Sequence, residues 1–249
     1  MNKRHSKILS ILSDGHQSTV NELSDKLSVS PATVRQDLTS LEKQRFLRRV
    51  HGGAVIDESD DISHRMGINY EKKMSIARAA KEFIHEGETI FIESGSINAL
   101  FAKEVSSVNN VTIITSNAFI ARQVNSDISG SVILLGGIYQ KESECLVGNL
   151  AKMCIKNLNF SKSFIGIDGF TPETGFTGRD MMRAELNTEI IRNSNQVFIL
   201  SDSSKFGKIA LSKYCNASEI HYLITDKDLK EEYKQYFNAV PVNLILANT

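Results

Sequence analysis

Strand and helix patterns alternate regularly from residue 73 to near the end of the chain, and this alternation constrains the fold more than any other feature. Short runs rich in Ile, Val and Phe, typical of buried strands, are separated by segments with apolar residues at helical spacing. Repeated units of this kind predict a parallel sheet covered by helices on both faces. We therefore expect residues 73–249 to form a Rossmann-like α/β domain. Strands are predicted at residues 89–93, 111–115, 132–135, 163–167, 197–200 and 221–225, and helices at 74–84, 97–105, 118–125, 145–157 and 181–193.

Residues 1–56 carry a different pattern, with three short amphipathic helices and then a hairpin. Ser30 is a favoured N-cap for the third helix, and Pro31 fits its first turn, where an N–H has no partner anyway. Two β-prone runs around a glycine-containing turn at residues 46–55 predict a β-hairpin. The helices are predicted at about 4–13, 19–27 and 31–44. This order of elements predicts a winged helix-turn-helix domain of the α+β class.

In a helix-turn-helix, the second helix of the pair lies in the major groove of DNA. With Val34, Leu38 and Leu41 packed inside, the opposite face turns outward, where Arg can pair with guanine and Gln with adenine. The helix N-terminus can hold a phosphate, and basic wing residues can meet the DNA backbone or minor groove. The predicted DNA-binding residues are Ser30, Thr33, Arg35, Gln36, Thr39, Arg48, Arg49 and His51. A protein-interaction module is the alternative that this pattern alone leaves open.

The charge distribution supports a nucleic-acid partner for the first domain. The whole chain has no net charge, but residues 1–56 hold nine Lys and Arg against five Asp and Glu, a net charge of +4. A basic head on an acidic body suits a head that meets a polyanion. Residues 57–72 are predicted to be a linker that begins with the acidic, solvated run 57–61. Asp37, beside the DNA-facing residues, is expected to pair with a neighbouring Arg.

Several classes of protein are disfavoured by composition. The three cysteines, Cys145, Cys154 and Cys215, are an odd number without close pairing, which argues against a disulfide framework and favours a cytoplasmic location. The six histidines show no metal-binding spacing, so no metal site is expected. No apolar run approaches the roughly 20 residues that span a bilayer, so no membrane partner is expected. The Gly-x-Gly-x-x-Gly fingerprint is missing, and no cofactor is predicted.

Small, hydroxyl-bearing or acidic residues follow each of the six predicted strands. Parallel sheets bind ligands beyond the carboxyl ends of their strands. Residues 93–96 join the first strand to a helix, where backbone N–H groups and the positive helix end can hold a phosphate. Ordinary turn chemistry explains each strand end taken singly, but six on one edge predict a ligand site. The predicted effector-binding residues are Glu93, Ser94, Gly95, Ser96, Asn117, Gly137, Asp168, Gly169, Arg179 and Lys205.

The first domain resembles the N-terminal domain of the DeoR family of bacterial transcriptional regulators, nearly in register over residues 4–55. One departure is Gln36, where many members carry a second Arg, and it concerns the operator bases rather than the docking mode. The matching segments are residues 20–23, 27–30, 33–38, 41–42 and 48–54.

The second domain resembles the sensor domain of the same family, which is related to sugar-phosphate isomerases. Residues 161–169 and 202–207 are the most specific matches, and the run 172–183 looks closest to the YciT-like members. Most of the family has Asp-x-Gly-Thr-Thr at the phosphate loop, whereas this chain has Glu93 and Ile97. Phosphate binding by backbone N–H groups is expected to survive, and the identity of the effector stays open.

The relation to isomerases raises a sugar-phosphate isomerase-like enzyme as an alternative. That chemistry needs a carboxylate base and a cation that stabilises the enediolate. Asp168 is kept, but Asn187 stands at the base position and Gly178 near that of the lysine, while Glu185 and Arg179 leave a substitute pair open. We expect no catalytic residues and ligand binding without turnover.

The resemblance implies a repressor of carbohydrate-metabolism genes whose operator binding is modulated by a phosphorylated sugar. Its expected partners are double-stranded operator DNA, a phosphorylated small-molecule effector and further copies of itself in a dimer or tetramer. A nucleoid or RNA-binding protein is a third hypothesis, which predicts binding without sequence preference. Tyr139, Met181 and Met182 are expected to pack rather than line the ligand site.

Overall fold

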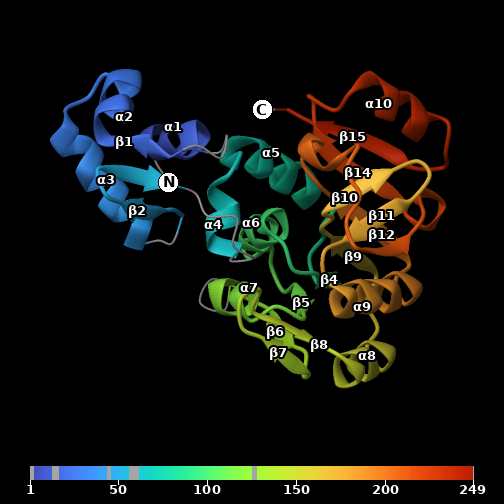
Figure 1. Ribbon diagram of the computed structural model, residues 1–249. Helices are drawn as coiled ribbons and strands as arrows, with labels where there is room; N and C mark the ends of the chain where they lie inside the picture. Colours follow the sequence, from blue (N-terminus) through green and yellow to red (C-terminus); the bar gives the residue numbers. More distant parts are fainter. Residues whose placement is uncertain (1–2, 13–16, 44–45, 56–61, 125–127, 249) are drawn as a thin grey trace. The chain divides into compact units, whose positions relative to one another are not determined.

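The computed structural model describes residues 3–12, 17–43, 46–55, 62–124 and 128–248 (Figure 1). The chain divides into two compact units, Met1–Glu71 and Lys72–Thr249, with the boundary inside helix α5 (Tyr70–Lys81). The acidic run 57–61 of the predicted linker lies outside the described residues, and helix α4 (Ile62–Gly67) and the start of α5 occupy much of the remainder. No described helix is both long and apolar enough to cross a membrane.

The first unit contains the predicted helices, packed around fully buried side chains that include Leu9, Leu23 and Leu38. Thr19 caps the second helix in a capping box, because its hydroxyl accepts the Glu22 N–H and the Glu22 carboxylate accepts the Thr19 N–H. The helices are α1 (Lys3–Leu12), α2 (Val20–Leu27) and α3 (Pro31–Lys43). α2, the tight turn after it and α3 form the predicted helix-turn-helix.

The wing is a three-stranded antiparallel sheet in the order β1-β3-β2. The predicted hairpin turns at Gly52, whose φ of 77° favours glycine, and a third strand from the segment before α2 pairs with it. A Cβ at Gly53 would lie 2.2 Å from the Ser18 carbonyl oxygen, so only glycine allows this pairing. The strands are β1 (Ser18–Thr19), β2 (Arg48–Val50) and β3 (Gly53–Val55).

Asp37 is a buried carboxylate on α3 that ties this helix to α1. Its oxygens accept hydrogen bonds from Arg4 Nε (2.5 Å) and Nη2 (2.9 Å), and His5 Nε2 lies 3.1 Å away. Burial raises the pKa of this carboxyl, but the hydrogen bond and charge of Arg4, with a further contribution from His5, outweigh burial and lower the pKa. The pairing with an arginine that the sequence predicts is confirmed.

The second unit is built on a seven-stranded sheet in which every neighbouring pair is parallel, as the alternation predicts. The strands, in the order β15-β14-β12-β9-β4-β5-β6, are β4 (Thr89–Ile92), β5 (Thr112–Thr115), β6 (Ser131–Leu134), β9 (Lys162–Ile165), β12 (Gln196–Leu200), β14 (Tyr222–Asp226) and β15 (Asn243–Ala247). The helices are α6 (Ser96–Val105), α7 (Ala118–Val124), α8 (Asn149–Lys156), α9 (Met181–Arg192) and α10 (Glu231–Asn238).

The strand order reverses at β4. The chain places β5 and β6 on one side of β4, then returns to add β9, β12, β14 and β15 on the other side. The loops that leave the carboxyl ends of β4 and β9 therefore diverge, and such a switch point is where parallel sheets bind ligands. Residues 93–96, predicted to hold a phosphate, follow β4 at this point.

A stack of aromatic rings holds two helices of the site on the sheet. Phe164, Phe198 and Tyr222 are register neighbours on β9, β12 and β14, with ring centroids 4.7 and 4.4 Å apart. Phe101 of α6 lies 4.3 Å from Phe164, and Phe83, which follows α5, lies 5.2 Å from Phe198. Because aromatic contacts of this kind add to the gain from burial, they fix α5 and α6 firmly against the strands.

Three parts of the second unit differ from the prediction. The pattern over residues 145–157 predicts one helix, but β8 (Cys145–Val147) pairs with β7 (Ile138–Gln140) and the helix begins only at Asn149. A small antiparallel sheet and the strand β15 are also unpredicted. β7 and β8 have three residues each, too few for an alternation to show, whereas β15 is as long as β12 and its apolar run 244–247 was missed. The small sheet consists of β10 (Gly169–Thr171), β11 (Gly175–Gly178) and β13 (Ser212–Cys215).

We predict that Asp37→Asn destabilises the first unit by on the order of 1–2 kcal/mol, because Arg4 loses its charged acceptor. A carboxyl whose pKa is lowered by folding contributes stability above its unfolded pKa of about 3.9, and this contribution is lost as the pH falls through the folded pKa. Amide hydrogen exchange of α1 and α3 in the full chain should therefore differ between wild type and variant near pH 7 and converge in acid. Asp25→Asn, at an exposed carboxylate on α2, is the control, and an equal loss in both variants would contradict this role.

Candidate functional site

The predicted DNA-binding residues of α3 occupy its outer face. Val34 and Leu38 are fully buried, whereas Arg35 and Gln36 are exposed, as the helical spacing predicts. Ser30 accepts the Thr33 N–H (3.2 Å), and its hydroxyl lies 2.9 Å from the Thr33 hydroxyl, so it caps the helix. The N-terminal turn of α3 is thus preformed, and the side chains of Arg35 and Gln36 are not part of the core.

Arg49 connects the wing to α3. Its backbone N–H donates to Glu42 Oε1 (2.9 Å), and its guanidinium Nη1 donates to Thr39 Oγ1 (3.1 Å). The Thr39 hydroxyl in turn donates to the Arg35 carbonyl (2.8 Å), so Thr39 bonds within the first unit. Its contact with DNA stays a prediction. Arg48 and His51 are exposed on the hairpin, where the sequence predicts them.

A hollow of about 410 Å³ lies between the start of α2, α3 and the wing. Arg35 and Arg49 both line it, together with Asn21, which sequence reasoning missed. Two guanidinium groups in one concave surface are suited to phosphate and base edges. Asn21 lies beside the Thr19–Glu22 capping box. The sequence there indicates the start of a helix but gives no sign of a DNA contact, which is why Asn21 was missed.

At the switch point of the sensor unit, one side chain joins the carboxyl ends of β4 and β9. Asn98 of α6 is fully buried, and its Nδ2 donates to the Glu93 carbonyl (2.9 Å) and the Phe164 carbonyl (3.1 Å). Glu93 Oε2 accepts the Gly166 N–H (3.3 Å) across the same junction. These contacts join the loops after β4 and β9, between which parallel sheets form their binding crevice.

The loop after β4 opens α6 in a way that suits an anion. Ser94 and Ser96 are buried, and Gly95 adopts φ 144°, which favours glycine. Gly95 is the N-cap of the helix, and without a side chain it cannot itself cap the first turn. The N–H groups of this turn and the positive end of the helix dipole are suited to an anion.

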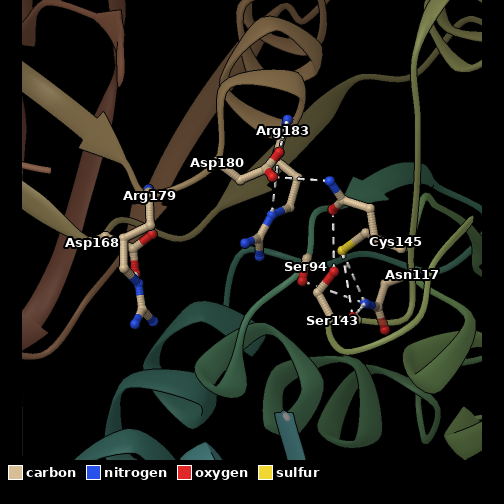
Figure 2. Close-up of polar contacts among 9 residues, drawn as sticks. Ser94, Asn117, Ser143, Cys145, Asp168, Arg179, Asp180 and Arg183 are labelled. Atoms are coloured by element: carbon tan, nitrogen blue, oxygen red, sulfur yellow. Dashed lines mark hydrogen bonds and ion pairs between the residues drawn. The ribbon is translucent and has the colours of Figure 1, made fainter. Parts of the chain in front are cut away.

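The loop after β5 forms the next part of the wall (Figure 2). Asn117 Nδ2 donates to Ser94 Oγ (3.3 Å) and to the Ser143 carbonyl (2.8 Å), and lies 3.4 Å from Cys145 Sγ. Burial raises the pKa of the Cys145 thiol, and the charge of Glu93 adds to this rise. Cys145 is therefore a protonated, packing thiol rather than a nucleophile.

Side chains at the start of α9 face this wall from the other side of the site (Figure 2). Asp168 accepts the Arg179 backbone N–H (3.0 Å) and lies 3.2 Å from its guanidinium Nε. Asp180 caps α9 by accepting the Arg183 N–H (2.8 Å), and it also accepts from Gln140 Nε2 (2.9 Å). Arg179, just before the N-cap, and Arg183, in the first turn of α9, therefore both come from the start of this helix.

Arg183 and Gln140 are site residues that sequence reasoning missed. The Arg183 guanidinium lies close enough to Cys145 for its positive charge to act on the thiol, which places it near the Ser94 loop. Gln140 Oε1 accepts from the Ser143 hydroxyl (3.2 Å), so the β7–β8 hairpin is joined to α9 through Asp180. The spacing from Arg179 was the one signal available for Arg183, and Gln140 carries none.

Lys205 lies at the carboxyl end of β12, on a short 3-10 helix (Ser203–Lys205) held by two carboxylates. Asp202 caps this helix through Ser204, and Asp226 accepts the Ser203 N–H (2.7 Å) and hydroxyl (2.9 Å). Burial raises the pKa of Asp202, but the charge of Lys73 and the hydrogen bond from Ser204 outweigh it and lower the pKa. Asp202 is therefore an ionised carboxylate near neutral pH.

The counter-ions of these carboxylates come from the first turn of α5. Lys72 Nζ lies 2.6 Å from Asp228 and 3.9 Å from Asp226, and the buried Lys73 provides the positive charge that acts on Asp202. Sequence reasoning missed both lysines because basic residues at the start of a helix usually mark a solvated face. The helix that leads out of the first unit is thus tied electrostatically to the loops that carry Lys205.

The predicted effector-binding residues follow the carboxyl ends of strands, and for two of them, both glycines, the structure offers a steric explanation. A Cβ at Gly137 would lie 2.6 Å from the Val147 carbonyl oxygen, and one at Gly169 would lie 2.5 Å from the Lys208 carbonyl oxygen. Close backbone contact therefore explains both glycines without a ligand. Tyr139 and Met181 are more than half exposed, so the expectation that they pack is wrong.

Two family models cover nearly all of the chain. Residues 4–60 match the model described as "DeoR-like helix-turn-helix domain", and residues 68–227 match "DeoR C terminal sensor domain". The chain belongs to the DeoR family. The family predicted from the sequence motifs is confirmed, whereas membership of the YciT-like subgroup stays a prediction.

Relatives in the DeoR family match this chain over almost their whole length. The HTH-type transcriptional regulator GolR of Listeria innocua is 34% identical, over 97% of this chain and 98% of that protein. The HTH-type transcriptional regulator IolR of Bacillus subtilis is 29% identical over 95% of each, and the lactose phosphotransferase system repressor of Staphylococcus epidermidis is 30% identical over 88% of this chain and 91% of that protein. This member of the DeoR family is a helix-turn-helix transcriptional regulator.

Solved structures with a partly similar fold include ribose 5-phosphate isomerase A of Methanocaldococcus jannaschii and eIF2B delta of Chaetomium thermophilum. The first is 18% identical with a TM-score of 0.41 and covers 55% of each chain. The second is 14% identical with a TM-score of 0.46 and covers 65% of this chain and 57% of that chain. Both likenesses are too weak to support a statement about activity.

The isomerase alternative is not favoured for this DeoR-family chain. Glu185, the residue considered as a substitute base, is exposed and bonds to Lys152 (2.5 Å). Asn187 stands at the expected base position and is a buried amide that cannot abstract a proton. The site therefore offers groups suited to an anion, but no carboxylate stands at the position expected for the isomerase base.

We predict that Asn98→Asp weakens the sensor domain by about 3 kcal/mol or more, because a carboxylate would then face carbonyl oxygens that now accept from Nδ2. Thermal and urea unfolding of the full chain measure this loss. Asn149→Asp, an exposed residue in the first turn of α8, makes the same chemical change and should leave stability almost unaltered. Similar midpoints for Asn98→Asp and wild type would show that the junction of β4 and β9 does not depend on this amide.

Proposed function

We propose that this regulator represses carbohydrate-metabolism genes and that a phosphorylated sugar bound in its sensor domain alters its affinity for operator DNA. The observation that carries the proposal is the glycine-capped N-terminus of α6 at the switch point, with Ser94 and Ser96 beside it. GolR and IolR are named as transcriptional regulators, and the lactose phosphotransferase system repressor is named as a repressor. The protein would act in the cytoplasm, on double-stranded DNA.

The phosphate of the ligand is expected at the loop 94–96, where α6 offers N–H donors. The rest of the ligand would extend across the crevice toward Asp168 and Arg179, which can bond to hydroxyl groups. Arg183, near Cys145, and Lys205, after β12, would supply further positive charge. A phosphorylated polyhydroxy compound matches this combination of an anion site and paired polar groups.

A route from the ligand to the head runs through α5. Lys205 and Asp202 share one short helix, and the charges of Lys72 and Lys73 act on the carboxylates that hold it. A ligand anion at Lys205 competes for the same positive charges, so it changes the contacts of the first turn of α5. A ligand shifts operator affinity only as far as it favours one arrangement of the protein over another.

DNA recognition is proposed for α3 and the wing, with Arg35 and Gln36 at base edges and Arg48, Arg49 and His51 at the backbone or minor groove. The exposure of these residues and the shared hollow of Arg35 and Arg49 support this assignment. A helix-turn-helix reads one half-site, so two heads are needed for a palindromic operator.

We predict that Arg35→Ala weakens binding to a duplex selected from a random library by the wild type, by about 5- to 150-fold, the range expected for one bidentate base contact. Fluorescence anisotropy at a fixed salt concentration measures the change. Arg192→Ala, at an exposed arginine of the sensor domain, should bind like wild type. If wild type prefers the selected duplex no more than random DNA, the nucleoid hypothesis replaces the regulator hypothesis.

We predict that at least one member of a panel of pentose and hexose phosphates raises the unfolding midpoint of the full chain, since a ligand at 100 times its Kd stabilises by about 2.7 kcal/mol. The same compound should change affinity for the selected duplex. Lys205→Ala should lose most of the shift, and Lys227→Ala, at an exposed lysine of the same domain, should keep it. No response from any sugar phosphate in either assay would contradict the sensor role, and turnover of one would revive the isomerase.

A further inference from the structure

An apolar surface lies at the β6 end of the sensor unit, and it is not part of the ligand site. Six large apolar side chains there are between 37% and 61% exposed. They come from the strands β6 and β7 and the helix α8. The six are Ile133, Leu134, Ile138, Tyr139, Leu150 and Met153, and together they are named the β6 surface.

The local backbone brings these side chains together. A Cβ at Gly136 would lie 3.3 Å from Leu150 Cδ2, and one at Gly148 would lie 3.3 Å from Ile138 Cδ1. α8 therefore packs beside the β6–β7 connection, and Met153 lies one helical turn beyond Leu150 on the same face. Figure 1 shows β6, β7 and β8 at the same end of the sheet, with α8 directly after β8.

The strand β6 is an edge that needs a cover. It is the last strand of the seven-stranded sheet, and no described strand pairs with its outer side. Ile133 and Leu134 point to opposite faces of the sheet, yet both are exposed. An apolar edge strand with open N–H and C=O groups pairs readily with another chain.

Two ion pairs beside the β6 surface favour a copy of the same chain as the partner. Lys152 bonds to Glu185 (2.5 Å), and Arg122 bonds to Glu144 (2.8 Å), so these four charges are paired within one chain. When two identical surfaces meet, identical charges approach, which is unfavourable unless they are already neutralised. Because these ion pairs are already neutral within one chain, repulsion between two copies is small. The same neutrality offers little attraction to a partner of opposite charge.

The size of the β6 surface suits the core of a dimer interface. Six side chains at this exposure present roughly 500 Å² of apolar area per chain, at the upper end of the largest patches on monomers. A stable interface buries about 800 Å² per partner, with an apolar core and a polar rim. The six side chains supply most of such a core.

We propose that the β6 surface is the contact between two copies of this chain, related by a two-fold axis beside β6. A two-fold contact buries the same residues on both copies, which the apolar, internally neutralised surface allows. It also provides the two heads that a palindromic operator needs, and this last support alone rests on the proposed function.

Sedimentation velocity of the full chain at micromolar concentration tests the proposal. Wild type should sediment with at least twice the mass of one chain, and the double variant Leu150→Glu, Met153→Glu with half the wild-type mass or less. We expect the dissociation constant of the contact to rise at least about a hundredfold, since charges would enter the centre of the interface. Circular dichroism and thermal unfolding check that the variant folds, as exposed positions should allow.

The matched control is the double variant Ile209→Glu, Leu211→Glu, at two apolar side chains that are even more exposed but lie outside the β6 surface. It should keep the wild-type mass. A second measurement uses wild type alone. Amide hydrogen exchange in residues 131–134 and 149–156 should be slower in a concentrated sample than in a dilute one.

Four outcomes would each overturn the proposal. The wild type could be a monomer, or the Leu150→Glu, Met153→Glu variant could keep the wild-type mass. The Ile209→Glu, Leu211→Glu control could lose that mass, or concentration could slow amide exchange in other segments instead. None of these measurements contains DNA or a sugar phosphate. Failure of the β6 contact is therefore distinguishable from failure of the regulator function.

Discussion

The buried amide of Asn98 joins two strand ends of the sensor domain at the point where the strand order reverses. It donates to backbone carbonyls at the ends of β4 and β9, so two loops that leave in different directions start from one joined position. Because Asn98 belongs to α6, the same contact also fixes the N-terminus of that helix against the sheet. Ser94 on one wall and Asp168 on the other take their places from this junction, and an anion site without a rigid floor would discriminate poorly between ligands.

Local rules in the sequence predict the larger elements well. The alternation of strand and helix patterns predicts the parallel sheet, and Ser30 followed by Pro31 predicts the start of α3, because periodicity and capping act over a few residues. The short strands are different. β1, β7 and β8 have two or three residues each, and each is defined by a partner elsewhere in the chain rather than by its own pattern. No single-segment signal could have found them.

The candidate site follows the same division. Ser94 and Asn117 come together because a parallel sheet gathers the carboxyl ends of its strands on one edge, which the order of elements already implies. Gly137 shares such an edge for a steric reason that only the backbone contacts reveal. Arg183 and Lys73 lie inside helices, and their long side chains act on residues of other elements, so the structure rather than local spacing assigns them to the site.

The head separates the residues that build it from those that meet a partner. Gly53 lies so close to the Ser18 carbonyl that the backbones of β3 and β1 are in direct contact, which holds the wing together. Arg35 and Gln36 are exposed and are not packed in the core. Substitutions at these two positions therefore cost the fold almost nothing. With base reading by these residues, as proposed, gene duplicates can drift toward new operators one residue at a time while every intermediate stays folded.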